Sequence, residues 1–350
     1  MAKLPYGQLV LTYLWCSDNL KTAMGFSNIL SIISSDLEEV ENELEANIKS
    51  PVPLVYEISK YLLGSGGKRL RPAVLLLSSG ACGRLEGKER IYSAAALELI
   101  HTATLLHDDV VDDAKLRRGK ASSNIVWGNK ATVLVGDFML AKALGLIQSC
   151  GDLELIKAVT DAAAKLAEGQ VLEVMNANNM LEVNEEVCFG IIENKTASLL
   201  ESCGRVGAIL AGVDGGLKHS VGQYGFNIGI AFQLTDDALD YSSTEEEFGK
   251  GVGQDLIEGK MTLPLFYSIQ EASSSERAKI NDILISEEVF TEDDLGFVRD
   301  IVERYKGVQK TNDMAEDYIE KAKNAISLLP DTPYKNSLDS LAEYIVERRG

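Results

Sequence analysis

Two long segments of the chain, residues 89–113 and 217–242, are apolar on almost every side of the helix that their spacing predicts. A helix that is apolar all round is buried among other elements of a folded domain. Elsewhere, apolar residues recur at intervals of three and four, and strand-like alternation is hard to find. Only seven prolines interrupt the chain, whose long segments are rich in strong helix formers. The sequence therefore predicts an all-α protein with these two helices at its centre.

The same spacing gives the order of helices and loops. Polar and glycine-rich stretches at 64–67, 117–123 and 242–260 are predicted loops, and no linker or repeat divides the chain. We therefore assign residues 24–350 to a single domain and residues 1–23 to a poorly placed leader, with Met24 as an alternative start. The predicted helices cover residues 36–49, 53–64, 70–81, 89–113, 130–148, 153–179, 184–202, 217–242, 262–272, 291–304, 307–327 and 335–348.

Charge and composition exclude several classes of protein. The formal net charge of −19 disfavours nucleic-acid binding, because phosphate backbones attract a basic surface. Five widely spaced cysteines without a C-x-x-C motif predict free thiols in a reducing cytoplasm. Three histidines are too few for a histidine-rich metal site, so carboxylates would have to hold any metal. No apolar run approaches the roughly 20 residues that a transmembrane helix needs, so no span is predicted.

Each of the two central helices carries an Asp-Asp-x-x-Asp cluster. The clusters are Asp108, Asp109 and Asp112, and Asp236, Asp237 and Asp240. The outer acids of each are four residues apart and share a helix face, with His101 on the first face and Gln233 on the second. A single cluster is more often a helix cap or a solvated face, but two copies inside apolar helices disfavour that interpretation. Buried carboxylates are costly without partners, and oxygen-only ligation favours Mg²⁺.

Basic residues suited to phosphate lie near these clusters in sequence. They are Lys68, Arg69 and Arg71 after the glycine-rich loop, Arg117 and Arg118 after the first cluster, Lys195 beside Thr196, and Lys250 and Lys260 after the second cluster. Glycine-rich backbone at a helix start favours anions, although no Walker motif is present. Taken singly, each basic residue fits an exposed or snorkelling side chain as well. Two acidic faces opposed across a cavity would form a clamp for a diphosphate.

Together these strings resemble the trans-isoprenyl diphosphate synthase family. They occur in family order across residues 64 to 264. The resemblance implies a single large helical bundle around a deep central cavity, usually a homodimer, and Mg²⁺-dependent prenyl transfer with three ions when the diphosphate is bound. The matching strings are Gly66-Gly67-Lys68-Arg69-Leu70-Arg71-Pro72, His101, Asp108-Asp109-Val110-Val111-Asp112, Arg117-Arg118-Gly119, Gly136-Asp137, Lys195-Thr196, Phe232-Gln233, Asp236-Asp237-Ala238-Leu239-Asp240 and Gly259-Lys260-Met261-Thr262-Leu263-Pro264.

The resemblance also implies roles for individual residues. The two Asp clusters would hold Mg²⁺ ions that bind an allylic diphosphate, such as farnesyl diphosphate, while isopentenyl diphosphate would be the second substrate. Arg117, Lys250 and Lys260 would contact the allylic diphosphate. The isopentenyl diphosphate would be bound by Lys68, Arg71, His101 and Arg118. The residues near the reacting allylic carbon would be Lys195, Thr196 and Gln233.

Product length would be set along the helix that precedes the first Asp cluster. Ala103 and Thr104, five and four positions before Asp108, are both small, whereas short-chain members of the family place a bulky residue there. Phe138 and Met139, in the helix predicted at 130–148, are candidates for the floor of the tunnel. We therefore predict a long all-trans product, around octaprenyl, of the kind used for quinone side chains.

Four alternatives remain open. A short-chain farnesyl or geranylgeranyl diphosphate synthase would use the same motifs. A terpene cyclase normally mixes Asn, Ser or Thr and Glu in its second metal motif, and a non-catalytic prenyl synthase subunit loses Asp or Arg. An HD-type phosphohydrolase built on His101 and His107 leaves the second cluster unexplained. We expect a cytoplasmic homodimer that touches a membrane transiently to release its product.

Overall fold

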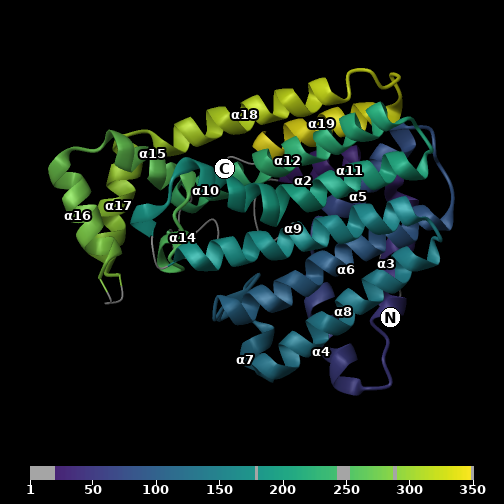
Figure 1. Ribbon diagram of the computed structural model, residues 1–350, viewed down its shortest axis with the longest axis horizontal. Coiled ribbons are helices and arrows are strands. Elements are labelled where there is room, and N and C mark those ends of the chain that lie inside the picture. Colours follow the sequence, from purple (N-terminus) through teal and green to yellow (C-terminus); the bar gives the residue numbers. More distant parts are fainter. Residues whose placement is uncertain (1–19, 178–179, 243–252, 287–289, 348–350) are drawn as a thin grey trace. The chain divides into compact units, whose positions relative to one another are not determined.

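The computed structural model describes residues 20–177, 180–242, 253–286 and 290–347. Most of these residues lie in helices (Figure 1). The strands among them are β1 (Leu116–Arg117) and β2 (Lys120–Ala121), an antiparallel pair in which Leu116 lies opposite Ala121. The prediction of an all-α protein is confirmed, and the hairpin is a short exception inside a predicted loop.

The described residues fall into two compact units. The first draws on Met1–Ala163, Leu199–Gly225 and Ala325–Leu341, and the second on Ala164–Ser198, Phe226–Asn324 and Ala342–Gly350. Each unit is described by itself. The single domain assigned to residues 24–350 stays a prediction.

The first unit contains most of the helices that precede residue 163. Its elements, some of which continue into the second unit along the chain, are α2 (Leu20–Ile29), the 3₁₀ helix η1 (Ser31–Ile33), α3 (Ser34–Asn47), α4 (Pro53–Leu63), α5 (Leu70–Ala81), α6 (Lys88–Val111), α7 (Ser123–Trp127), α8 (Asn129–Ser149), α9 (Leu153–Ala177), α11 (Ser198–Leu210), α12 (Gly215–Ser242) and α19 (Pro333–Glu347). α5 is buried from Pro72 to Ala81 and packs against α6. Each large apolar side chain buried in this way contributes about 1.5–3 kcal/mol.

Helix α6 ends within the first Asp cluster, at Val111, with Asp112 as its C-cap. Asp112 N–H donates to the Asp108 carbonyl at 2.8 Å, and the next residue, Asp113, has a left-handed backbone with φ 50°. Asp tolerates this region better than most residues, so it can end a helix where glycine is absent. The cluster therefore occupies the last turn of a long buried helix, where its side chains reach the helix end.

Helices α6 and α8 lie side by side (Figure 1). A Cβ added to Gly136 would lie 2.4 Å from His107 Nε2, and at the other end Ser93 Oγ is 3.9 Å from Cys150 Sγ. These two contacts make the helices antiparallel. Counting three residues along each helix from the first contact brings Thr104 roughly level with Met139.

The second unit is built around a small apolar core. Leu256, Leu265, Ile283, Val298 and Val302 are among its buried members. Two of its helices begin with capping boxes, which satisfy backbone N–H groups at the helix start. Its elements, besides the rest of α9, α12 and α19, are η2 (Met180–Glu182), α10 (Glu185–Ile192), the π-helix η3 (Glu193–Ala197), α14 (Gln254–Ile257), α15 (Leu263–Glu271), α16 (Ser274–Leu284), α17 (Glu292–Arg304) and α18 (Gly307–Ala325).

Several predicted boundaries were wrong. The single helix predicted at 184–202 is α10, the π-helix η3 and α11, which continues to Leu210. Helix α2 begins at Leu20, inside the predicted leader, whose residues 1–19 lie outside the described residues. The short helices α7 and α14 lie partly or wholly in predicted loops, and α16 was missed because its sequence is mainly polar.

The predictions on thiols and membrane spans were also tested. The four cysteines in the described residues are free thiols, as predicted. Among the described helices, α8 is the one long and apolar enough to cross a membrane. The sequence prediction missed it because Lys130, Asp137 and Lys142 interrupt its apolar run. Its packing along α6 is that of a helix inside a folded domain.

Candidate active site

The three acids of the first Asp cluster differ in burial. Asp108 and Asp112 are half-buried, whereas Asp109 has no exposed surface. Asp109 Oδ1 accepts a hydrogen bond from Arg117 Nε at 2.5 Å, and Asp109 Oδ2 is buried without a hydrogen-bond partner. The structure thus separates an outer pair, Asp108 and Asp112, from an inner acid that holds an arginine. Metal binding by Asp109 stays a prediction.

The β1–β2 hairpin carries Arg117 and Arg118. Arg118 and Gly119 form its turn, both with positive φ. The hydroxyl of Tyr61, on α4, donates to the Ala121 carbonyl at 2.8 Å, and the Tyr61 ring meets Trp127 edge-on with 5.1 Å between centroids. Helix α4 therefore holds the hairpin in place through one aromatic side chain.

His101 lies among arginines that the sequence places far apart. Burial, followed by the positive charges of Arg71, Arg118, Arg117 and Arg69, lowers the pKa of His101 well below its usual value. The imidazole is therefore neutral at physiological pH and can donate a hydrogen bond without adding charge. The structure thus brings together four of the residues predicted to bind diphosphates, namely Arg71, His101, Arg117 and Arg118.

The glycine-rich loop lies against the hairpin. A Cβ added to Gly67 would lie 3.3 Å from Arg118 Nη1 and 3.5 Å from Arg69 Nη1. Lys68, the next residue, is exposed. Arg71 is in the first turn of α5, with its Nε buried and without a hydrogen-bond partner. The predicted isopentenyl diphosphate residues thus come from the loop between α4 and α5 (Lys68), from α5 (Arg71), from α6 (His101) and from the hairpin (Arg118).

The residues predicted to set product length lie on the facing helices α6 and α8. Ala103 and Met139 are fully buried, whereas Thr104 and Phe138 are half-buried. The Thr104 hydroxyl is turned back to the His101 carbonyl, to which it donates at 2.7 Å. Because the helices are antiparallel, Phe138 and Met139 are roughly level with Leu105 and Thr104 rather than farther along α6. A floor made by them would therefore lie beside the tunnel mouth.

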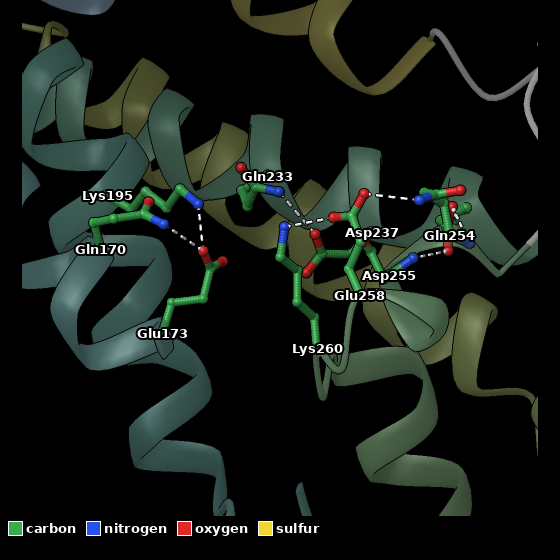
Figure 2. Close-up of polar contacts among 10 residues, drawn as sticks. Gln170, Glu173, Lys195, Gln233, Asp237, Gln254, Asp255, Glu258 and Lys260 are labelled. Carbon is green, nitrogen blue, oxygen red and sulfur yellow. Dashed lines mark hydrogen bonds and ion pairs between the residues drawn. The ribbon is translucent and has the colours of Figure 1, made fainter. Parts of the chain in front are cut away.

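In the second unit, a chain of hydrogen bonds joins three predicted residues. Thr196 Oγ1 donates to Gln233 Oε1 at 2.8 Å. Gln233 Nε2 in turn donates to Asp237 Oδ1 at 2.8 Å (Figure 2). Burial raises the pKa of Asp237 to about 7, with the charges of Asp236 and Asp240 adding to the effect and the Gln233 hydrogen bond opposing it. As in the first cluster, the middle acid is buried and bonded within the protein, while the outer two are half-buried.

Two glycines allow the π-helix η3 to approach its neighbours. A Cβ on Gly229 of α12 would lie 2.6 Å from the Ala197 Cα, and one on Gly169 of α9 would lie 2.6 Å from the Lys195 N. Both distances are too short for a side chain. Helix η3 is therefore held between α9 and α12, which turns Thr196 toward Gln233.

Lysines of the second unit are paired with glutamates. Lys195 Nζ donates to Glu173 Oε2, which also accepts from Gln170 Nε2 at 3.3 Å (Figure 2). Lys260 Nζ is 2.7 Å from Glu258 Oε2. Glu173 was missed in the sequence because a glutamate three residues after a glutamine looks like an ordinary polar face of a helix. Lys250 lies outside the described residues.

Asp255 is a second residue that the sequence analysis missed. Asp240 Oδ1 accepts from the backbone N–H of Gln254 and Asp240 Oδ2 from that of Asp255, each at 3.2 Å, so Asp240 caps α14. Burial and the nearby charges of Asp237 and Asp240 raise the pKa of Asp255 well above its usual value. The available signal was that Asp255 and Glu258 lie between the two predicted loop lysines, Lys250 and Lys260, whereas the prediction used only the lysines.

These side chains line one pocket within the second unit. Its polar wall includes Glu173, Lys195, Thr196, Gln233, Asp237, Asp255 and Lys260. Apolar and thiol side chains line another part of it, among them Val183, Cys188, Ile191, Ile192, Met261 and Leu263. Burial raises the pKa of Cys188 to about 12, so its thiol is not a nucleophile at neutral pH. The pocket thus combines a charged wall of three acids and two lysines with an apolar wall.

The outer acids fit a hard divalent cation. In the part of the chain that the structure describes, no group of three or more His, Cys, Asp or Glu residues is placed to hold a metal ion. Mg²⁺ needs no such group, because it binds one or two carboxylates and completes its shell with water and phosphate. The half-buried pairs Asp108 with Asp112 and Asp236 with Asp240 supply such ligands. They belong to different units, so joint action on one diphosphate stays a prediction.

Known proteins resemble the chain along nearly its whole length. A family model described as polyprenyl synthetase matches residues 52–300, in both units. The octaprenyl diphosphate synthase of Haemophilus influenzae is 38% identical over 93% of this chain and 98% of its own. A polyprenyl synthase from Caulobacter crescentus, crystallised with calcium and isoprenyl diphosphate, is 36% identical with a TM-score of 0.88, covering 93% and 98% of the two chains. A decaprenyl diphosphate synthase from Rhodobacter capsulatus is 33% identical with a TM-score of 0.88, covering 93% and 99%.

Proposed function

Because the chain belongs to the polyprenyl synthetase family of prenyltransferases, we propose that it condenses isopentenyl diphosphate head to tail with an allylic diphosphate and repeats the step to make a long all-trans polyprenyl diphosphate, around octaprenyl. One observation carries the proposal. Neutral His101, with Arg71 and Arg118 close to it, lies two turns before the carboxylate pair Asp108 and Asp112 on the same helix. A reaction between two diphosphates needs two anion sites. Basic side chains can bind one diphosphate directly, and a carboxylate pair can bind the other through a metal cation.

In the proposed reaction, the C1–O bond of the allylic diphosphate breaks and C1 forms a bond with C4 of isopentenyl diphosphate. A proton then leaves C2 of the isopentenyl unit and is taken by the released diphosphate. Arg117 neutralises the departing group, and Lys68, Arg71, His101 and Arg118 hold the isopentenyl diphosphate. The Thr196 hydroxyl and the Gln233 amide, fixed by their hydrogen bond, lie beside the allylic carbon. Such orientation of two reactants supplies much of the rate of a bimolecular step.

Divalent cations are the remaining requirement. Asp108, Asp112, Asp236 and Asp240, together with Asp255, are the residues that we propose to hold Mg²⁺, up to three ions with the diphosphate bound. When bound, the ions act as Lewis acids on the diphosphate oxygens. The calcium in the Caulobacter relative supports a divalent cation. Removal of metal by a chelator is expected to abolish turnover, with Mg²⁺ restoring it.

The experiment that tests the function uses the purified full-length chain with isopentenyl diphosphate, farnesyl diphosphate and Mg²⁺. Products are dephosphorylated and their chain length is read by chromatography and mass spectrometry. We expect all-trans products around octaprenyl, because Ala103 and Thr104 leave the side of α6 unblocked. Farnesyl or geranylgeranyl products would refute the long-chain assignment, and absence of turnover would favour a subunit that needs a catalytic partner.

We also propose that a second copy of the chain covers an apolar face on α7 and α8. Leu134 is 66% exposed and Leu144 41% exposed, and both lie on α8. Ile125 and Val126 of α7 are also exposed. Analytical ultracentrifugation is expected to give a dimer in solution and a monomer for the L134E/L144E variant. We propose cytoplasmic residence with transient membrane contact for product release, testable by cell fractionation.

A further inference from the structure

The sequence Lys68-Arg69-Leu70-Arg71 puts three cations within four residues at the start of α5. On sequence alone, all three suit a diphosphate. The structure distinguishes Arg69 by its partners, because its guanidinium is bonded within the protein. Its side chain is 9% exposed, and it contacts two glutamates from other helices.

The hydrogen bonds of Arg69 use most of its donors. Arg69 Nε donates to Glu41 Oε1 at 2.5 Å and Nη2 to Glu41 Oε2 at 3.2 Å. Nη1 donates to Glu98 Oε1 at 2.9 Å, and Nη2 also reaches the Leu63 carbonyl at 3.4 Å. The guanidinium therefore joins α3, through Glu41, to α6, through Glu98, and to the end of α4. A planar fork makes this set of bonds, and a lysine ammonium cannot.

The backbone of Arg69 is unusual in the same place. Arg69 precedes α5 with a left-handed conformation, φ 49° and ψ 37°. A residue with a side chain adopts this region only where its surroundings hold it there. The two glutamates supply that restraint, and the conformation fixes the directions in which the neighbours Lys68 and Arg71 leave the chain.

We propose that Arg69, held by Glu41 and Glu98, is a positioning residue for the isopentenyl diphosphate site and does not bind the diphosphate itself. The inference rests on the proposed function, which assigns that substrate to Lys68, Arg71, His101 and Arg118. Besides its bond to Arg69, Glu98 has a second role at this site. Its Oε2 is buried without a hydrogen-bond partner, as is Arg71 Nε, and its charge acts on Arg69, Arg71 and Arg118 together. It therefore serves as the resident counter-charge that keeps the arginines together before the substrate arrives.

The direction in which Glu41→Gln changes the KM for isopentenyl diphosphate separates positioning by Arg69 from direct binding by Arg69. Glu41→Gln removes a negative charge near an anion site, which by electrostatics alone strengthens anion binding. If Arg69 bound the diphosphate, Glu41→Gln would also release its guanidinium for that purpose. Both effects lower the KM for isopentenyl diphosphate. Positioning predicts the opposite, since the loop loses its anchor and the KM rises.

The experiment measures initial rates of the full-length enzyme with each substrate varied in turn, for the wild type, Arg69→Lys and Glu41→Gln. For Arg69→Lys we expect the KM for isopentenyl diphosphate to rise about tenfold, or about 1.4 kcal/mol, while kcat and the KM for the allylic substrate change by less than about twofold. For Glu41→Gln we expect a smaller rise in the same KM. Arg84→Lys is the matched control, because Arg84 pairs with Glu89 at 3.1 Å and is 41% exposed. It is expected to leave both KM values unchanged.

Binding of isopentenyl diphosphate alone, measured by titration calorimetry, makes the test independent of turnover. If the wild type does not elongate prenyl chains and both variants bind isopentenyl diphosphate more weakly than the wild type does, the proposed function is refuted and the inference is supported. A KM that is unchanged or lower in Glu41→Gln would overturn the inference. So would equal rises in both KM values, which indicate a general loss of structure. A wild-type chain that neither turns over nor binds isopentenyl diphosphate would overturn both proposals.

Discussion

Replacing the buried acid Asp109 by asparagine tests which acids of the first cluster bind metal. Asp109 has no exposed surface, and Arg117 Nε donates to it at 2.5 Å. Asparagine keeps the shape and one acceptor oxygen, so Asp109→Asn removes the charge with little change in packing. If Asp109 anchors Arg117, the variant loosens an arginine proposed to contact the allylic diphosphate and leaves the outer pair, Asp108 and Asp112, in place.

The size of the effect follows from the contact. A hydrogen bond between charged groups contributes about 1.5–3 kcal/mol. The Arg117 side chain is 25% exposed, so water replaces part of what is lost, and we expect the lower part of that range. About 1.5–2 kcal/mol corresponds to an increase of about tenfold to thirtyfold in the KM for the allylic diphosphate.

The assay varies the allylic diphosphate at saturating Mg²⁺, and then Mg²⁺ at saturating substrates. Asp109→Asn is expected to raise the KM for the allylic diphosphate. The Mg²⁺ concentration that gives half the maximal rate is expected to stay within about twofold of the wild-type value. Asp112→Asn, at an outer acid, is expected to raise half-saturation by Mg²⁺. Asp113→Asn is the control, because Asp113 is exposed and asparagine tolerates its left-handed backbone. The reasoning fails if Asp109→Asn shifts the Mg²⁺ dependence as Asp112→Asn does and leaves the KM unchanged.

Three further predictions use other parts of the molecule. Thr104→Tyr, at a half-buried position, is expected to shorten the product, as read by mass spectrometry; unchanged length would refute the tunnel along α6. Tyr61→Phe, which removes the bond to Ala121, is expected to raise the KM for isopentenyl diphosphate about threefold to tenfold with kcat unchanged, as about 0.5–1.5 kcal/mol of hydrogen bonding is lost. Hydrogen bonds from Ser273 and Tyr305 lower the pKa of Glu276 to about 2, so its contribution to stability is complete above about pH 4.5 and is lost as the pH falls toward 2. The difference in free energy of unfolding between wild type and Glu276→Gln is therefore expected to shrink over that interval in denaturant titrations, and a constant difference would contradict the assignment.

Periodicity was sufficient for the long helices because their apolar faces are continuous. Helices α5 and α6 begin and end within a few residues of the prediction. Periodicity failed at η3, where the hydrogen bonding changes to i→i+5 but the apolar pattern still looks α-helical. The close packing around the π-helix depends on Gly169 and Gly229, which lie on two other helices. A contact of that kind is not visible in a local pattern.

The site showed a similar division. Residue types and spacing selected the acids and cations correctly as a group, and the structure brings Arg71, His101, Arg117 and Arg118 together. Spacing did not reveal that each cluster has a buried middle acid, because burial depends on the partners Arg117 and Gln233. Nor did it reveal that Arg69 is paired with Glu41 and Glu98, because these acids come from other helices.

The contact between Gly136 and His107 makes these two positions dependent on each other. The imidazole occupies the volume that a methyl group at 136 would need, and it follows Leu106 and precedes Asp108 on α6. A larger residue at 136 must displace the ring and disturb the outer acid beside it. Gly136→Ala should thus be harmful alone and tolerated when residue 107 is made smaller. In a comparison of many related enzymes, the two positions would be expected to change as a pair, although neither is assigned a contact with substrate.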